Sequence, residues 1–275
     1  MLEKWHCKWV QLVRIVFPFS LYLLWVSAAA CGQDLPCGVQ VRPPVLRVLK
    51  EVQQQFGKAV TCDLDPHLHD LRNEWALYDV APDGSKRGSP VIRVDANAPR
   101  PEAEIAHELL HLQLLARSGF RKVVLQTEGT PLHGTSEQEY ALVEFILGDV
   151  LDHIVIFPKL REMDLHPEKE NRDSLARALA VHGRPNWDNK STVWRAVMYA
   201  GLTTEIQDRV VLKQLEDSME KAGWNDALRL GRELRDSMER ADLTTLEGKG
   251  NEEVKAFKIL YGSKLQMRWQ YAPVP

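Results

Sequence analysis

The 275-residue chain lacks the features that would place it in a special class of protein. Its 35 Lys and Arg residues are matched by 38 Asp and Glu residues, so no excess of positive charge attracts phosphate groups, and nucleic acid is not an expected partner. It has no repeat of fixed period and no long Gly/Ser linker. With 44% hydrophobic residues, the composition excludes collagen-like and wholly disordered chains and favours an ordinary globular protein.

Cysteine is scarce, and its spacing excludes two common sites. The four cysteines are Cys7, Cys31, Cys37 and Cys62, and none forms a C-x-x-C pair, which excludes a zinc ribbon and a thioredoxin motif. If the chain is exported and its first segment removed, Cys37 and Cys62 are the natural partners for one disulfide. In a cytosolic chain the same two residues would be small buried side chains.

Residues 1–30 have the pattern of a secretory signal peptide. Three basic residues, Lys4, Lys8 and Arg14, precede an apolar run at 15–26 and the small residues 27–30. The apolar stretch up to residue 30 is shorter than the roughly 20 residues that a membrane-spanning helix needs, although an uncleaved membrane anchor stays open. We therefore expect export.

Two ways of processing this leader remain open. An ordinary signal peptidase would cut after Ala30, whereas Ala29-Ala30-Cys31-Gly32 resembles a bacterial lipobox, in which Cys31 carries a lipid. Either way the protein is expected outside the cytoplasm, secreted or membrane-anchored. The alternative is a cytoplasmic protein with a buried N-terminal helix.

Apolar periodicity and turn residues predict an α+β fold. We expect a zincin-like α/β metal-binding domain over 31–163, with a small N-terminal sheet and one central helix, and a mostly helical C-terminal lobe over 164–275. The strands are predicted at 59–64, 74–80 and 90–94, with a hairpin between the last two. The helices are predicted at 45–56, 102–117, 136–157, 168–181, 192–199, 205–222, 227–241 and 252–261, with Pro158 ending or kinking the third and 120–135 irregular.

One motif carries chemistry: the sequence His107-Glu108-Leu109-Leu110-His111 inside the helix predicted at 102–117. Histidines four residues apart lie on one helical face, so their ring nitrogens can converge on one ion at about 2.0 to 2.1 Å. Glu108 would lie beside that ion, where it can take a proton from a water activated by the metal and pass it to a leaving amine. A core helix with two satisfied histidines is the structural alternative.

This segment resembles the active-site helix of the HExxH zinc metallopeptidases, the zincins. The metzincin branch requires Gly three residues and His six residues after the second His, but Leu114 and Arg117 stand there. The resemblance is therefore to a gluzincin-like rather than a metzincin site. It implies a Zn²⁺ ion held by His107, His111 and a third ligand from farther along the chain.

The third ligand is expected on the helix predicted at 136–157. Asp149 and His153 form an i, i+4 pair on one face, which suits a zinc-bound imidazole whose other nitrogen is held by a carboxylate. Glu144 and Glu139 are the competing ligands, and Glu144 lies about 180° from His153 around the helix, so both cannot reach one ion. We favour His153 as the ligand, with Asp149 behind it.

These residues predict a zinc-dependent hydrolase, most simply a metallopeptidase that acts on a peptide or protein substrate. Glu108 is the expected general base and acid, and the strand leading into the motif helix, over 89–95, is a candidate edge for an extended peptide. The alternative is a non-catalytic binding or regulatory module in which the metal only stabilises the fold. Nothing in the sequence describes the substrate preference.

Overall fold

The computed structural model describes residues 36–65, 74–78, 89–95, 97–98, 100–127, 137–166, 168–262 and 267–273. The leader and Cys31 lie outside these residues. The described protein is mostly helical with two small sheets, in agreement with an α+β fold in the coarse sense. Its elements are η2 (Pro36–Gly38), α2 (Pro43–Phe56), β1 (Thr61–Asp65), β2 (Glu74–Tyr78), β3 (Ser89–Asp95), α3 (Pro101–Arg117), β4 (Arg121–Thr127), α4 (Glu137–Glu162), α5 (Glu168–His182), α6 (Thr192–Glu205), α7 (Arg209–Lys221), α8 (Asn225–Met238), α9 (Leu246–Tyr261) and β5 (Met267–Pro273).

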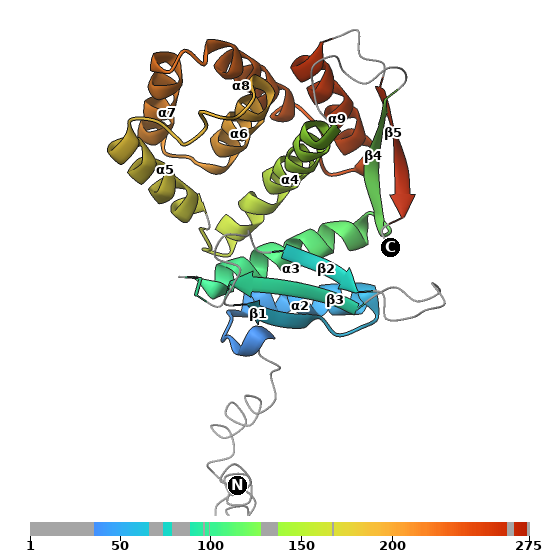
Figure 1. The fold of residues 1–275 in the computed structure, drawn as a ribbon. Coiled ribbons are helices and arrows are strands. Elements are labelled where there is room, and N and C mark those ends of the chain that lie inside the picture. The colour runs from blue at the N-terminus through green and yellow to red at the C-terminus, as the bar shows by residue number, and fades with distance from the viewer. Residues whose placement is uncertain are drawn as a thin grey trace, which may run out of the picture.

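The N-terminal sheet lies against α2 and α3 (Figure 1). Its strand order is β1-β3-β2, with β1 parallel and β2 antiparallel to β3, so the predicted hairpin between the second and third strands is confirmed. Because β3 is paired on both sides, the expectation that residues 89–95 form a free edge for a peptide is wrong. The Cys37–Cys62 disulfide expected for an exported chain joins the segment before α2 to β1.

Helix α2 shows how local sequence sets these elements. Pro43 stands at its first position, where the missing N–H costs nothing, and Gly57 ends it with a φ of 66°. Its buried face, formed by Val45, Leu49 and Val52, packs into one core with β3 and α3. This packing fixes the position of α3.

Helix α4 joins the two parts of the molecule, running from the sheet layer into the helical part (Figure 1). Near its C-terminus, Ile156 and Leu160 belong to the core around α2 and α3, whereas Val143 and Leu147 belong to a second core with α6, α8 and α9. Pro158 does not end this helix, which continues to Glu162. One rigid element thus contributes side chains to both cores.

Helix α6 approaches α4 closely at a glycine. A Cβ atom on Gly201 would lie only 2.9 Å from Cγ2 of Val150, so a larger residue there would force the two helices apart. The last residue of α6, Glu205, lies one turn beyond Gly201. The close approach therefore brings the C-terminal end of α6 up against α4.

Several predicted helix boundaries, and part of the segment predicted to be irregular, are wrong. Residues 121–127 form β4, which pairs antiparallel with β5, and neither strand was predicted. Helix α6 extends to Glu205, and α7 starts only at Arg209 because the Asp208 side chain accepts the N–H groups of Val210 and Val211. Helix α9 starts at Leu246 and not at residue 252.

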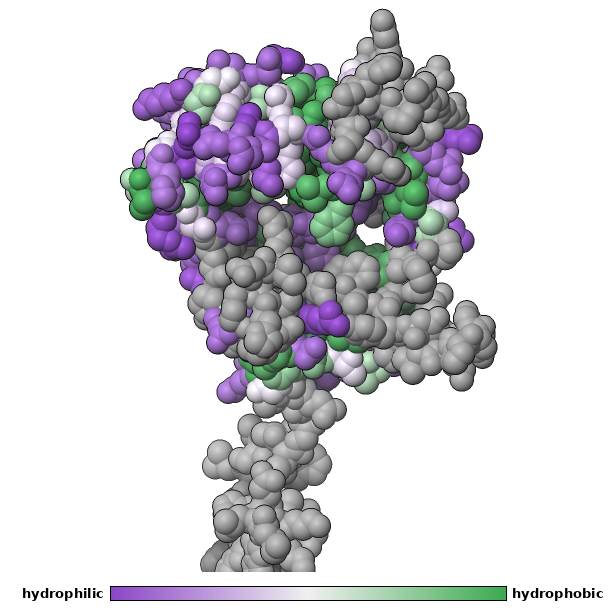
Figure 2. Space-filling view, viewed as in Figure 1, coloured by the Kyte–Doolittle hydropathy of each residue, from purple (hydrophilic) through white to green (hydrophobic). Residues whose placement is uncertain are grey.

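Most of the described surface over α5 and α7 is hydrophilic (Figure 2). Charged residues on these helices face solvent, and Leu175 and Leu215 lie in a third core beneath them. Val181 and Val210 are exposed apolar exceptions. Within the described part of the chain, none of the helices combines the length and the apolar character that a membrane span requires.

Candidate metal centre

Helix α3 holds the first two histidines in a buried setting. Pro101 begins it, and acidic residues in the first turn match the positive end of the helix dipole. Ile105, Leu109 and Leu112 are fully buried, so the helix cannot rotate without exposing its core face. His107 and His111 therefore project from one fixed face towards α4.

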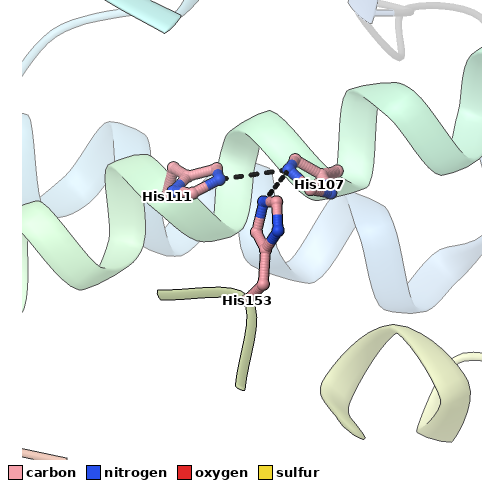
Figure 3. Close-up of side chains that lie close together, drawn as sticks. All are labelled: His107, His111 and His153. Atoms are coloured by element: carbon pink, nitrogen blue, oxygen red, sulfur yellow. Dashed lines mark hydrogen bonds between the residues drawn. The ribbon is translucent and has the colours of Figure 1, made fainter. Parts of the chain in front are cut away.

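His153 of α4 completes a cluster of three imidazoles (Figure 3). Its Nε2 lies 3.1 Å from Nε2 of His107, and Nε2 of His111 lies 3.1 Å from the same atom. The ligand atoms of all three residues lie within 4.8 Å of one another. The structure thus brings together the three histidines that the sequence singled out, close enough to bind one metal ion.

The partners of the outer ring nitrogens decide what the cluster presents at its centre. Nδ1 of His153 lies 2.9 Å from Oε1 of Glu205, and a carboxylate oxygen only accepts, so Nδ1 of a neutral His153 is the donor. Nε2 of His153 then carries no hydrogen, and its lone pair faces His107. Nε2 of His107 cannot donate to both neighbours at once, so a bound cation satisfies the three nitrogens better than hydrogen bonds do.

Asp149 occupies a different place from the one predicted. Its Oδ1 lies 3.4 Å from Nε2 of His153 and 3.8 Å from Nε2 of His111, on the side where the three imidazoles face one another. The nitrogen that Asp149 was expected to hold, Nδ1 of His153, is taken by Glu205. The physical reason is that the i, i+4 spacing brings Asp149 close to His153 but does not choose the ring edge.

Behind His111 lies a second, partly buried carboxylate. Oδ2 of Asp152 is 3.8 Å from Nδ1 of His111, and its Oδ1 accepts a hydrogen bond of 2.7 Å from Nζ of Lys249 on α9. Burial alone would raise the pKa of Asp152, but Lys249 and His111 hold it well below its usual range. The same carboxylate raises the pKa of Lys249 against the effect of burial. Asp152 and Lys249 are thus a charged pair behind the cluster.

Glu108 lies buried beside the cluster, as the motif predicts. Its side chain is about 4% exposed, and its Oε1 lies 4.0 Å from Nε2 of His107. The Phe157 ring stacks on His153 with centroids 4.8 Å apart and also contacts His107. An apolar wall therefore excludes water from one side of the three imidazoles, while a carboxylate lies on another.

The charge around the three imidazoles is mainly negative. Burial by itself would lower the pKa of His153, but its hydrogen bond to Glu205 and the nearby carboxylates of Asp149 and Asp152 raise it. The same carboxylates favour a cation at the centre of the cluster.

The competing candidates for a third ligand, Glu144 and Glu139, lie elsewhere. Oε1 of Glu144 accepts the backbone N–H of Leu125 in β4 at 3.2 Å, on the side of α4 away from His153. Within the described residues, neither Glu144 nor Glu139 belongs to the group of mutually close ligand atoms.

Sequence reasoning missed Glu205 and its partner Asn171, whose Nδ2 donates to Oε2 of Glu205 at 2.8 Å. Glu205 was placed at the start of a helix, where an acid is ordinary, whereas it ends α6. Had Asp208 been recognised as the cap of the next helix, Glu205 would have been placed at the end of the preceding helix, where an acid is unusual. Lys249 was missed because two glycines beside it concealed the start of α9.

Comparison of the chain with protein-family models, with curated proteins and with solved structures gives no match. The motif and the geometry of the cluster are therefore the observations from which a function can be argued.

Proposed function

We propose that this protein is a zinc-dependent hydrolase, most simply a metallopeptidase of the HExxH class. His107, His111 and His153 would hold the ion, and Glu108 would act as general base and then general acid. The observation that carries the proposal is the convergence of three Nε2 atoms beside the buried carboxylate of Glu108.

The spacing of the donor atoms fits zinc. Nitrogens at about 2.05 Å from a tetrahedral ion lie roughly 3.3 Å apart. The two distances of 3.1 Å between Nε2 atoms are close to this value. Imidazole donors also suit zinc better than magnesium or calcium, which prefer oxygen. Three protein ligands would leave a fourth position for water or substrate, as in catalytic rather than structural zinc sites.

The chain's own groups can perform the proton transfers of hydrolysis. A bound zinc ion supplies a Lewis acid that polarises a carbonyl and makes water acidic. Glu108, buried near His107, can accept the proton of the attacking water and deliver it to the leaving amine. Phe157 limits the access of bulk water to the cluster. Each of these groups comes from α3 or α4.

A peptide or protein is the proposed substrate, and the place of action is proposed to be outside the cytoplasm. The leader pattern supports export, and the Cys37–Cys62 disulfide agrees with it because such bonds persist in oxidising compartments. Membrane attachment through the N-terminal segment or a lipid on Cys31 belongs to the same proposal.

The test separates metal binding from catalysis with Glu108→Gln. Wild type and variant, both loaded with zinc, are assayed against a library of fluorogenic peptides. We expect the variant to bind zinc within about twofold of wild type and to lose activity by about 100-fold or more, since general acid–base catalysis contributes on that scale. Glu104→Gln, one turn earlier on α3, is the matched control and should stay active.

The outcome also decides between the enzyme and the non-catalytic module. A zinc-bound wild type that is as inactive as Glu108→Gln on the library and on unfolded protein substrates would contradict the hydrolase proposal. The metal would then stabilise a binding or regulatory module.

A further inference from the structure

Both carboxylate oxygens of Glu205 have a polar partner, although the residue lies where a negative charge is unfavourable. Oε1 lies 2.9 Å from Nδ1 of His153, and Oε2 accepts a hydrogen bond of 2.8 Å from Nδ2 of Asn171. Glu205 is only 7% exposed and ends α6, where the helix dipole disfavours an acid. Burial and the dipole both oppose its charge, so the two contacts are needed to hold it there.

Three helices build this arrangement. His153 comes from α4, Glu205 from α6 and Asn171 from α5. The approach of Gly201 to Val150 brings α6 near enough for Glu205 to reach the imidazole ring. Glu205 and Asn171 both lie beyond residue 163, outside the part of the chain that carries the HExxH motif. The helical C-terminal part therefore fixes one of the three imidazoles.

We propose that Glu205, held by Asn171, is a positioning residue that fixes the orientation and tautomer of His153 and thereby sets the affinity of the three-histidine site for a divalent metal. The inference rests on the metal site of the proposed function but not on hydrolysis. A carboxylate that accepts a hydrogen bond from the outer nitrogen of a ligating imidazole stops the ring from rotating. It also makes the inner nitrogen a stronger electron-pair donor to the metal. Asn171 in turn keeps the carboxylate plane in place.

Zinc affinity, measured on the full chain by competition with a chelator, tests this role. Glu205→Gln keeps an oxygen that can accept from Nδ1 but loses the charge, so we expect it to weaken zinc binding by about 10- to 100-fold. Asn171→Ala should weaken binding in the same direction but less, because Glu205 keeps its contact with His153. Asn171 is exposed, so its replacement leaves the core intact.

A matched control separates positioning from a general effect of removing a buried charge. Glu252 of α9 is 5% exposed, accepts a hydrogen bond from the Ser237 hydroxyl of α8 and is not part of the three-histidine group. Glu252→Gln should lower the stability of the metal-free protein without changing zinc affinity by more than about twofold. The visible spectrum of the Co²⁺-loaded protein should change in Glu205→Gln and not in Glu252→Gln.

Exchanging the amide and the carboxylate between positions 171 and 205 gives a further test. Asn171→Asp places two carboxylates face to face and should weaken zinc binding more than Asn171→Ala does. Combining it with Glu205→Gln lets the new amide donate to the new carboxylate and accept from His153, so the double variant should bind zinc more tightly than Asn171→Asp alone. A purely structural role for Glu205 would change stability without this pattern in affinity.

Failure of this inference differs from failure of the proposed function. If wild type binds zinc and Glu205→Gln and Asn171→Ala bind it within twofold of wild type, the positioning role is overturned while the metal site stands. If Glu252→Gln weakens binding as much as Glu205→Gln, the role is overturned as well. A wild type that binds no zinc overturns both proposals.

Discussion

Oδ1 of Asp149 lies 3.4 Å from Nε2 of His153, the same nitrogen that faces His107. The carboxylate therefore stands beside the proposed ion and not behind its ligand. About a quarter of the Asp149 side chain is exposed, in contrast to the buried imidazole. Asp149 thus lies where solvent and the cluster meet, and its charge acts on whatever occupies the cluster.

Asp149→Asn should weaken zinc binding by about tenfold, since it removes a negative charge close to two ligating nitrogens while keeping the side-chain shape. Because Asp149 is partly exposed, the loss should shrink as ionic strength rises. Zinc affinity at low and at high salt checks this. Asp173→Asn, which breaks an exposed ion pair with Arg172 on α5, is the control. A loss that is independent of salt would argue against a charge effect.

Purified wild type should hold about one zinc ion per chain, measured by elemental analysis after gentle purification. The metal should be lost from each of His107→Ala, His111→Ala and His153→Ala, because two remaining protein ligands are too few to hold zinc. Glu144→Ala should keep it, since Glu144 contacts the backbone of β4. His182→Ala, at an exposed histidine of α5, is the matched control. Greater loss in Glu144→Ala than in His153→Ala would point to a glutamate ligand.

The buried acid Glu253 predicts how stability depends on pH. Burial, aided by Glu144 and Asp152, raises the pKa of Glu253 to about 7, while Lys249 lowers it. The folded state therefore binds this proton more tightly than the unfolded state, and the stabilisation is complete below the ordinary pKa of 4.5 and is lost as pH rises through 7.

Glu253→Gln keeps a neutral side chain at every pH. Its free energy of unfolding should exceed that of wild type by a margin that widens by about 2.5 kcal/mol between pH 5 and pH 8.5, measured by urea unfolding. Glu247→Gln, at an exposed acid of the same helix, should differ from wild type in free energy of unfolding by the same amount at both pH values. A margin that narrows with rising pH would contradict the buried-acid argument.

The leader supports a prediction about location. If Cys31 carries a lipid, Cys31→Ser should release the protein from the membrane fraction or stall its processing, whereas Cys7→Ser should change nothing because Cys7 is removed with the leader. A chain cut after Ala30 would be soluble and indifferent to Cys31→Ser. Recovery of an intact Met1 on cytosolic protein, with Cys37 and Cys62 reduced, would refute both export routes.

Local pattern was sufficient for much of the fold. The helix around the HExxH motif, α2 and the pairing of β2 with β3 follow from apolar periodicity, proline and glycine positions and turn residues, and the structure contains them. The pairing of β4 with β5 was missed because it joins residues 140 to 152 positions apart, from Thr127 with Met267 to Arg121 with Pro273. Nothing local in either strand specifies such a partner.

The candidate site likewise contains residues that the sequence predicted and residues that only the structure revealed. The sequence by itself determined His107, Glu108 and His111, because the geometry of one helix turn fixes how residues i, i+1 and i+4 lie relative to one another. It also narrowed the candidates for a third ligand to residues of α4. Only the tertiary structure decided that His153 and not Glu144 joins them, and that Glu205 holds His153, because these relations depend on how α4 and α6 pack around Gly201 and Val150.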